Sequence, residues 1–512
     1  MNHQAAVGSS AAPVAAVLRS PKTWRDKVAY GFGSIAFGVK DNGFTYLLMI
    51  FYNQALGLPA RTVGLAVMIA LIVDAMLDPL IGNWSDHFRS KWGRRHPFMY
   101  AAALPVAVSF YFLWNPPEGL SQTGLFWYLL VSAIVIRACI TCYEIPSSAL
   151  VADLSKDYDE RTSFLSYRFF FGWFGGLLLG VLAFSVFLVP SERYPVGQQN
   201  LDGYAAYGLT ASFMMLAAIL VSAWGTHRHI PEFDPAPPKR PFDLRRALGE
   251  VRQTLANRPF LSLLGYILAA NAAVGVTAAL VTYGRLFFWE LTSNQISFLL
   301  LANFLSIFVA FWAAPRLARA AGKKMAAIIF TFAGMVGVPL AYLLRLLDVL
   351  PADGPPLLLA ILFVMAGVFS FLVMSAGVVA SSMLADVVED SQRDTGRSSA
   401  GLFFSASAFV LKCVSGIGIF ASGVILDLVA FPEGAKAGEV PEAVLRNLVL
   451  TEMPVVLVLQ LLSLLALLAY PINRARHEAN LRSLRAHAGG HRSDDAPADE
   501  GAPMPVGGAG AV

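Results

Sequence analysis

The chain has 512 residues, of which 56% are hydrophobic and only 14% are charged, and its mean hydropathy is +0.59. This composition excludes an ordinary soluble globular protein, in which about 25% of the residues are charged. The formal net charge is small, +4, and the sequence contains no credible nucleic-acid-binding module, so we expect no nucleic-acid partner.

Apolar stretches of about 20 residues, each able to cross the ~30 Å hydrocarbon layer of a bilayer, recur along the chain. We therefore predict an all-α membrane protein with twelve transmembrane helices in two six-helix bundles. The predicted spans are 28–54, 62–84, 97–115, 124–148, 165–189 and 205–226 in the first bundle, and 260–289, 293–316, 322–346, 356–386, 400–429 and 448–471 in the second.

These spans divide the chain into five parts, which are an N-terminal tail (1–27), a first bundle (28–226), a central loop (227–259), a second bundle (260–471) and a C-terminal tail (472–512). Glycine, alanine, proline and acidic residues dominate the last tail, which cannot bury enough apolar surface to fold. Lysine and arginine concentrate in alternate loops, including the central one. By the positive-inside rule we expect both termini on the cytoplasmic side of a cell (inner) membrane.

The two halves share short motifs at matching positions. Leu150-Val-Ala-Asp153, which closes the fourth span, returns as Met383-Leu-Ala-Asp386, which closes the tenth. Gly93-Arg94-Arg95 before the third span is matched by Gly322-Lys323-Lys324 before the ninth. Parallel repeats of six spans are the plan of the major facilitator superfamily, whose binding sites lie near the membrane midplane between the two halves.

Two acidic residues interrupt the second span. Asp74 and Asp78 are four residues apart, so on a helix both carboxylates leave the same face. An ionised Asp near the bilayer centre costs about 2.5–3.5 kcal/mol on insertion scales. We interpret the pair as the lining of a hydrated cavity that binds a cation. The alternative is that these carboxylates form salt bridges that only hold the bundles together.

Other spans also contain charged or polar residues at depth, where such groups usually face the bundle interior and pair with each other. Spacings of three and four place the polar residues of the fourth span on one helical face. Arg285, near the end of the seventh span, is interpreted as an interfacial anchor. The residues at depth are Lys40 and Asp41 in span one, Arg137, Thr141, Glu144 and Ser148 in span four, Arg168 in span five and Lys412 in span eleven.

Gly172, Gly176 and Gly180 form a stripe of small residues on the fifth span. Such a stripe favours close helix packing over phosphate binding. We find no metalloprotease, serine-hydrolase or phosphate-loop motif, and no histidine lies inside a span. The sequence therefore does not indicate an enzyme, nor a cofactor other than a coupling cation.

Taken with these features, several motifs resemble the glycoside–pentoside–hexuronide:cation symporter family over nearly the whole chain between the tails. The motifs are Lys40-Asp41, Asp74-x-x-x-Asp78-Pro79, Ser85-Asp86-x-x-Arg89-Ser-Lys-Trp92-Gly93-Arg94, Glu144-Ile-Pro146, Tyr167-Arg168-Phe169-Phe170 and Lys412. The resemblance implies cation-coupled symport of a sugar or glycoside by alternating access.

The resemblance also implies roles for individual residues. Asp74, Asp78 and the Thr141 hydroxyl would bind the cation, with Asp41 nearby. The sugar site would involve Lys40, Asp41, Glu144 and Arg168, with Ser148 at a position where the melibiose-type members have a sugar-stacking Trp. Lys412 would link the two halves near the cation site, and we assign Arg137, Asp86 and Arg94 to coupling and gating together with it.

This chain departs from the melibiose-type pattern in ways that bear on cation and cargo. Leu77 replaces an Asn between the paired acids, which removes a neutral oxygen ligand and so weakens the case for Na⁺ and strengthens that for a proton. Glu144 replaces an Asp, and Ser148 makes a galactoside doubtful. The segment Thr141 to Leu150 is similar to one in the animal lysolipid transporters, so an amphipathic lipid cargo stays open, as does a membrane sensor that does not transport. Besides the bilayer and a small-molecule substrate, no obligate protein partner is evident.

Overall fold

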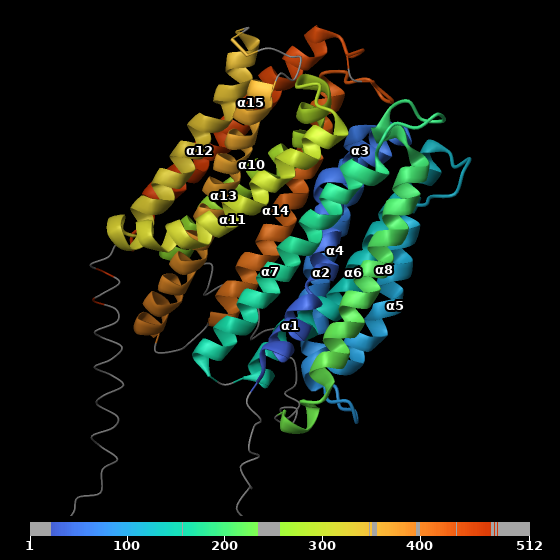
Figure 1. Ribbon diagram of the computed structural model, residues 1–512. Helices are drawn as coiled ribbons and strands as arrows, with labels where there is room; N and C mark the ends of the chain where they lie inside the picture. Colours follow the sequence, from blue (N-terminus) through green and yellow to red (C-terminus); the bar gives the residue numbers. More distant parts are fainter. Residues whose placement is uncertain are drawn as a thin grey trace, which may run out of the picture.

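The computed structural model describes residues 22–155, 157–233, 257–347, 349–350, 356–395, 400–436, 438–472, 476 and 479. These residues form helices and connecting loops and contain no β-strand, as predicted for an all-α protein. The helices run roughly along one direction, with α1–α8 on one side of the molecule and α10–α15 on the other (Figure 1). The predicted N-terminal tail (1–27), central loop (227–259) and C-terminal tail (472–512) lie partly outside the described residues.

The first half begins with a broken segment and continues with five long helices. The segment comprises α1 (Trp24–Phe32), α2 (Ile35–Asn42), the π-helical η1 (Gly43–Leu47), α3 (Leu48–Ile50) and the π-helical η2 (Phe51–Ala55). The long helices are α4 (Ala60–His87), α5 (His96–Leu113), α6 (Gln122–Leu154), α7 (Tyr158–Leu182), which continues as η3 (Ala183–Phe187), and α8 (Leu201–His227).

The second half contains six long helices. They are α10 (Arg258–Tyr283), which continues as η6 (Gly284–Phe288), α11 (Ser293–Ala321), α12 (Lys323–Leu346), α13 (Pro356–Thr395), α14 (Ala400–Leu428) and α15 (Glu442–Leu468). Within the described part of the chain, eleven helices are long and apolar enough to cross a membrane. The remaining predicted span, 28–54, is the first in the sequence and corresponds to the broken segment α1–η2. No single piece of this segment is long enough to cross a membrane by itself.

The broken segment packs closely against α7 through glycines. A side chain on Gly38 of α2 would collide with the carbonyl oxygen of Gly172, and one on Gly176 would meet the carbonyl of Gly38. Gly180 faces the Asn42 side chain in the same way. The prediction that the glycine stripe of the fifth span serves helix packing is confirmed.

The two halves meet along α4 and α14 and, on the other side, along α7 and α11. At the first of these contacts Gly64 approaches the backbone of Phe420, and Gly416 and Gly423 of α14 approach Met68 and Ala60. Because these glycines let the backbones come close, Lys412, one turn before Gly416 on α14, lies within ion-pair distance of Asp74 and Asp78 on α4.

Each half carries an ion pair at the end of the molecule where α1 begins, which we call the α1 end. Arg94 Nη2 lies 2.7 Å from Asp153 Oδ1 in the first half, and Lys323 Nζ lies 2.5 Å from Asp386 Oδ1 in the second. The repeated motifs of the two halves therefore form equivalent structures. Arg95 adds a second contact to Asp153, at 2.8 Å, and a weaker one to Asp86, at 3.4 Å.

Candidate functional site

A group of charged side chains occupies the middle of the molecule, where α4, α6 and α14 meet. Asp74 and Asp78 lie on consecutive turns of α4, as their spacing predicts. Pro79 follows inside the same helix. Proline has no N–H, so Pro79 donates no helical hydrogen bond to the carbonyl of Ala75. The Ala75 carbonyl oxygen, in the helical turn that joins Asp74 to Asp78, therefore lacks its usual partner.

Asp74 is almost completely buried, with 1% of its surface exposed, and its carboxylate is fully engaged. Its Oδ1 accepts a hydrogen bond from Thr141 Oγ1 at 2.7 Å, and its Oδ2 accepts one from Arg137 Nη1 at 3.2 Å. Lys412 Nζ lies 3.1 Å from the same Oδ2. Three helices from both halves thus converge on one carboxylate.

Asp78 shares the Lys412 ammonium with Asp74. Its Oδ2 accepts a hydrogen bond from Lys412 Nζ at 2.6 Å. Its Oδ1 is buried and has no hydrogen-bond partner among the described residues. Lys412 belongs to the second half and both acids to the first, so this ion pair joins the halves.

A second group of charges lies on α2 and α6. Lys40 Nζ is 2.8 Å from Asp41 Oδ1 and 3.9 Å from Glu144 Oε2. Lys40 is buried, whereas the Asp41 side chain is 60% exposed. Two acids share one base here, so this group carries an excess negative charge if all three are ionised.

Arg168 and Ser148 do not join these groups through their charged or hydroxyl ends. The Arg168 guanidinium donates to the Ser147 hydroxyl at 3.1 Å and to the backbone carbonyl of Glu144 at 3.5 Å, and it lies over the Phe37 ring. Ser148 donates to the Ile145 carbonyl of its own helix at 2.8 Å. Asp86 and Arg94, assigned to gating, lie at the α1 end.

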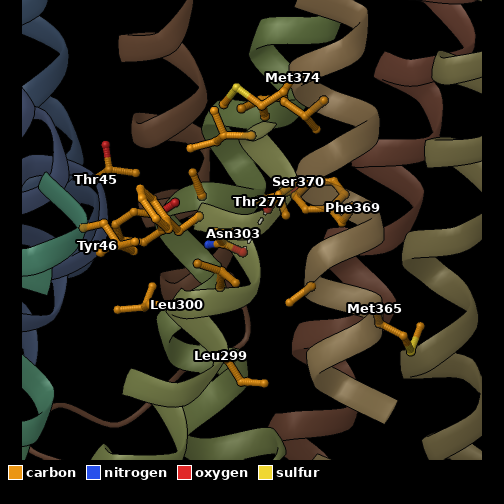
Figure 2. A pocket seen from close by; sticks show the side chains of 18 of the residues that line it. Thr45, Tyr46, Thr277, Leu299, Leu300, Asn303, Met365, Phe369, Ser370 and Met374 are labelled. Carbon is orange, nitrogen blue, oxygen red and sulfur yellow. Dashed lines mark hydrogen bonds between the residues drawn. The ribbon is translucent and has the colours of Figure 1, made fainter. Parts of the chain in front are cut away.

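A cavity of about 670 Å³ lies between the halves beside the charged groups. Its walls are contributed by α2 and η1, α7, α10 and η6, and α11–α13, and they are mostly apolar. Figure 2 shows Thr45 and Tyr46 on one wall facing Asn303, Phe369 and Ser370 on the other. Asn303 Oδ1 accepts a hydrogen bond from Ser370 Oγ at 2.9 Å.

Of the predicted site residues, only Asp41 lines this cavity. Arg285 lines it as well, and it is buried in the structure, so its interpretation as an interfacial anchor is wrong. Sequence reasoning missed it because it is followed by Phe287, Phe288 and Trp289, a pattern typical of a membrane interface. Glu452, a buried acid on α15, was also missed.

The arrangement suits the binding of one small cation and of a separate, larger solute. Carboxylate, hydroxyl and backbone oxygens gather around Asp74 and Asp78, next to an ammonium that a cation could replace. The cavity volume is within the range of about 300–1,000 Å³ that small-molecule sites occupy. Among the described residues no cluster of three or more His, Cys, Asp or Glu side chains has the geometry of a metal site.

Fold and site define a membrane transporter of the major facilitator type, and comparisons with known proteins agree. A family model described as MFS/sugar transport protein matches residues 29–474. The chain belongs to this family of multi-pass membrane symporters.

Several relatives resemble the chain over nearly their full length. An uncharacterized symporter of Synechocystis sp., sll1374, is 26% identical, with 90% of this chain and 96% of the relative covered. The putative glycoside/cation symporter YagG of Escherichia coli is 24% identical over 91% and 95%. The sodium-dependent lysophosphatidylcholine symporter 1-A of Danio rerio is 23% identical over 91% and 89%.

The solved structures confirm the fold. The inward open conformation of the E. coli xylose transporter XylE aligns with a TM-score of 0.60 at 13% identity, covering 90% of this chain and 98% of that one. At such low identity the similarity concerns the architecture alone.

Proposed function

We propose that the protein is a secondary active symporter that couples H⁺ or Na⁺ to the transport of a sugar or glycoside by alternating access. The observation that carries this proposal is the position of Lys412, whose ammonium from one half lies between two carboxylates of the other half, 3.1 Å from Asp74 and 2.6 Å from Asp78.

Coupling follows from the competition for these carboxylates. When the halves move apart on α4 and α14, Lys412 withdraws and leaves two like charges one helical turn apart, which is unfavourable. A proton on one acid, or Na⁺ held by Asp78, Thr141 and the free carbonyl of Ala75, replaces the lost positive charge. Cation binding and the ion pair between the halves then exclude each other, so the cation selects one conformation.

The cargo would bind next to this group. Lys40, Asp41 and Glu144 offer charged donors and acceptors suited to hydroxyl groups, and Asp41 reaches the large cavity. A cargo in the cavity and a cation at Asp74 and Asp78 would both depend on how α2, α4 and α6 are placed, so each would favour binding of the other. No cofactor beyond the coupling cation enters this mechanism.

The apolar lining of the cavity favours a second candidate, an amphipathic lipid as the cargo. A simple sugar offers little apolar surface to side chains such as Leu299, Leu300 and Met365, whereas an acyl chain or an aromatic aglycone offers much more. The relative from Danio rerio is named as a symporter of such a lipid.

For the orientation, we propose that the α1 end is cytoplasmic. The basic loops 85–96 and 317–324 both lie there, consistent with the positive-inside rule. Because α1 begins and α15 ends on that side, an even number of spans is required, and the broken segment α1–η2 together with the eleven long helices satisfies it.

Purified protein in liposomes tests the proposal directly. Inward gradients of Na⁺ and of H⁺ are imposed separately while a panel of labelled sugars, glycosides and lysolipids is followed. Accumulation against a concentration gradient that collapses with an ionophore is expected for one cation and one cargo class. If no cargo accumulates under either gradient, the symport proposal is wrong and a non-transporting role is favoured.

A further inference from the structure

Arg285 places a positive charge in the wall of the large cavity. It belongs to η6, the π-helical continuation of α10, and lies near Tyr46, Tyr342 and Trp289 in the cavity lining. Only 8% of its surface is exposed. Asp41, on another part of the lining, is the other charged residue there.

The Arg285 guanidinium has no partner within the described part of the chain. Among the residues that the structure describes, no carboxylate lies within 4 Å of this guanidinium and none accepts a hydrogen bond from it. The other buried cations near the centre are engaged, since Lys40 pairs with Asp41, Arg137 pairs with Asp74, and Arg168 donates to Ser147. Even Glu452, a buried acid on the neighbouring α15, is not within ion-pair distance of Arg285.

A buried charge without a partner is costly, because the protein interior does not replace its hydration. Guanidinium groups bind carboxylates and phosphates with two parallel hydrogen bonds, which makes Arg a specific anion-binding residue. An anionic group on the cargo would therefore supply the missing partner when the cavity is filled.

We propose that Arg285 binds the anionic group, a carboxylate or a phosphate, of an amphipathic cargo whose apolar part fills the rest of the cavity. This inference rests on the proposed function and specifies the cargo of the same cavity. The Asp41 carboxylate repels a second anion, so the cargo binds in one orientation, with its anion at Arg285 and its hydroxyl groups or a cationic group toward Asp41.

Equilibrium binding to the full chain in lipid nanodiscs tests this, without any ion gradient. Nanodiscs are preferable because detergent would compete for an apolar cavity. Two matched pairs of probes are compared, phenyl β-D-glucuronide with phenyl β-D-glucoside, and oleoyl lysophosphatidate with monooleoylglycerol, using empty nanodiscs as the blank. The first pair represents an acidic glycoside and the second a lysophospholipid.

In at least one pair, the anionic member is expected to bind about tenfold or more tightly than its neutral twin. Arg285→Gln abolishes this preference but keeps the affinity for the neutral twin, whereas Arg285→Lys retains part of it. Arg345→Gln is the matched control, since the Arg345 guanidinium lies over the Phe288 and Trp289 rings, close to Arg285 in the sequence, but Arg345 does not line the cavity. Its preference should equal that of the wild type.

The proposal is overturned if neither anionic probe is preferred, if no probe binds, or if Arg285→Gln keeps the preference. Because no gradient is used, these outcomes are independent of coupling. If the protein prefers the anionic probe but accumulates no cargo, the anion site at Arg285 is supported and the symport proposal is wrong.

Discussion

Asp78 directs one carboxylate oxygen to Lys412, and its other oxygen is buried without a hydrogen-bond partner among the residues that the structure describes. Asp74 is held from three sides by Thr141, Arg137 and Lys412. The two acids of the pair are therefore not equivalent. Asp74 is the fixed member, and Asp78 is the one with an oxygen free to take a proton or a cation.

Lys412→Met tests this difference between the acids. Loss of the ammonium leaves the Asp74–Asp78 repulsion uncompensated, so we expect a loss of about 1–3 kcal/mol in stability, part of which Na⁺ or mild acidification restores. The melting temperatures of wild type and Lys412→Met, with and without Na⁺ and at pH 7 and about pH 5.5, measure the loss and its recovery.

The double variant Lys412→Met/Asp78→Asn should lose less stability than the sum of the losses in the single variants Lys412→Met and Asp78→Asn, by about 0.5–3 kcal/mol. Lys436→Met is the control, because Lys436 lies on an exposed loop. Strict additivity of the two single variants, with no response to cation, would contradict the assigned contact.

The positions of the charged residues could be predicted, but not their partners. Two acids at a spacing of four necessarily share one helical face, and the structure has them there. Lys412 reaches both acids only because α14 packs on α4, and Lys412 and Asp78 are 334 residues apart in the sequence. The resemblance places Arg168 and Glu144 together in a sugar site, but their side chains form no ion pair within the described part of the chain. The Arg168 guanidinium donates to the backbone carbonyl of Glu144 instead.

Helix packing in the first half depends on glycines where α2 crosses α7. The carbonyl of Gly172 occupies the space that a Gly38 side chain would need. The small-residue stripe is readable from the sequence on α7, but its partner is not, since α2 belongs to a segment broken by π-helical turns.

Gly38→Ala should therefore destabilise the protein by about 1–3 kcal/mol through overpacking. Gly377→Ala is the matched control. Gly377 lies inside α13 with nothing within 4 Å of an added Cβ, so the change should be neutral or stabilise by up to about 1 kcal/mol. Thermal unfolding of both variants compares them. Equal melting temperatures would show that α2 and α7 do not pack this closely.

The first helix is fastened to the end of α8 by a polar network outside the apolar spans. Asp26 accepts hydrogen bonds from the backbone N–H of Thr23 and from Arg228, and its Oδ1 lies 2.8 Å from His229 Nε2. Burial raises the pKa of the Asp26 carboxyl, but the hydrogen bonds from His229, Thr23 and Arg228 outweigh it, so the pKa is well below the usual 3.8.

A lowered pKa gives a defined pH dependence. The ionised Asp26 stabilises the folded protein fully above its unfolded pKa, and this contribution is lost as the pH falls below about 4. The melting temperature of wild type should exceed that of Asp26→Asn at pH 7, and the difference should shrink toward pH 3. Asp202→Asn, at an exposed acid, serves as the reference. A difference that grows on acidification would be inconsistent with the network.

Apart from the Lys412–Asp78 contact in the middle, hydrogen bonds between the described residues of the two halves gather toward the end opposite to the α1 end. Tyr283 donates to Asn53 Oδ1 at 2.7 Å, Gln54 donates to the Pro432 carbonyl at 3.1 Å, and Gln199 donates to the Gly434 carbonyl at 2.7 Å. At the α1 end, the ion pairs that the described residues form stay within one half or the other. The structure is thus closed at the opposite end.

Tyr283→Phe removes one of these closing contacts. Because Asn53 Oδ1 still accepts a hydrogen bond from Gln54, the cost to the closed state is about 0.5–1.5 kcal/mol. Spin labels at Glu118 and Glu439, in exposed loops of the two halves at that end, should then show a larger population at long distance. Tyr128→Phe is the control, since Tyr128 donates within the first half, to the Phe112 carbonyl. An unchanged distance distribution would show that Tyr283 does not hold the halves together.

Hydropathy alone predicted the all-helical architecture, because long apolar stretches can only cross a bilayer as helices. The repeated motifs predicted two matching halves, and Arg94–Asp153 and Lys323–Asp386 occupy equivalent places. The cavity could not be predicted, because its walls come from helices of both halves that are far apart in the sequence, and its apolar residues resemble lipid contacts in the sequence. Arg285 was misassigned for the same reason.

The most direct test of the coupling mechanism compares two kinds of transport by the wild type and Asp74→Asn in the same liposomes. Exchange of labelled for unlabelled cargo needs no driving force, whereas accumulation needs the cation gradient. We predict that Asp74→Asn keeps measurable exchange and loses gradient-driven accumulation. Accumulation by Asp74→Asn with the same dependence on the cation gradient as the wild type would contradict the assignment of the buried acids to coupling.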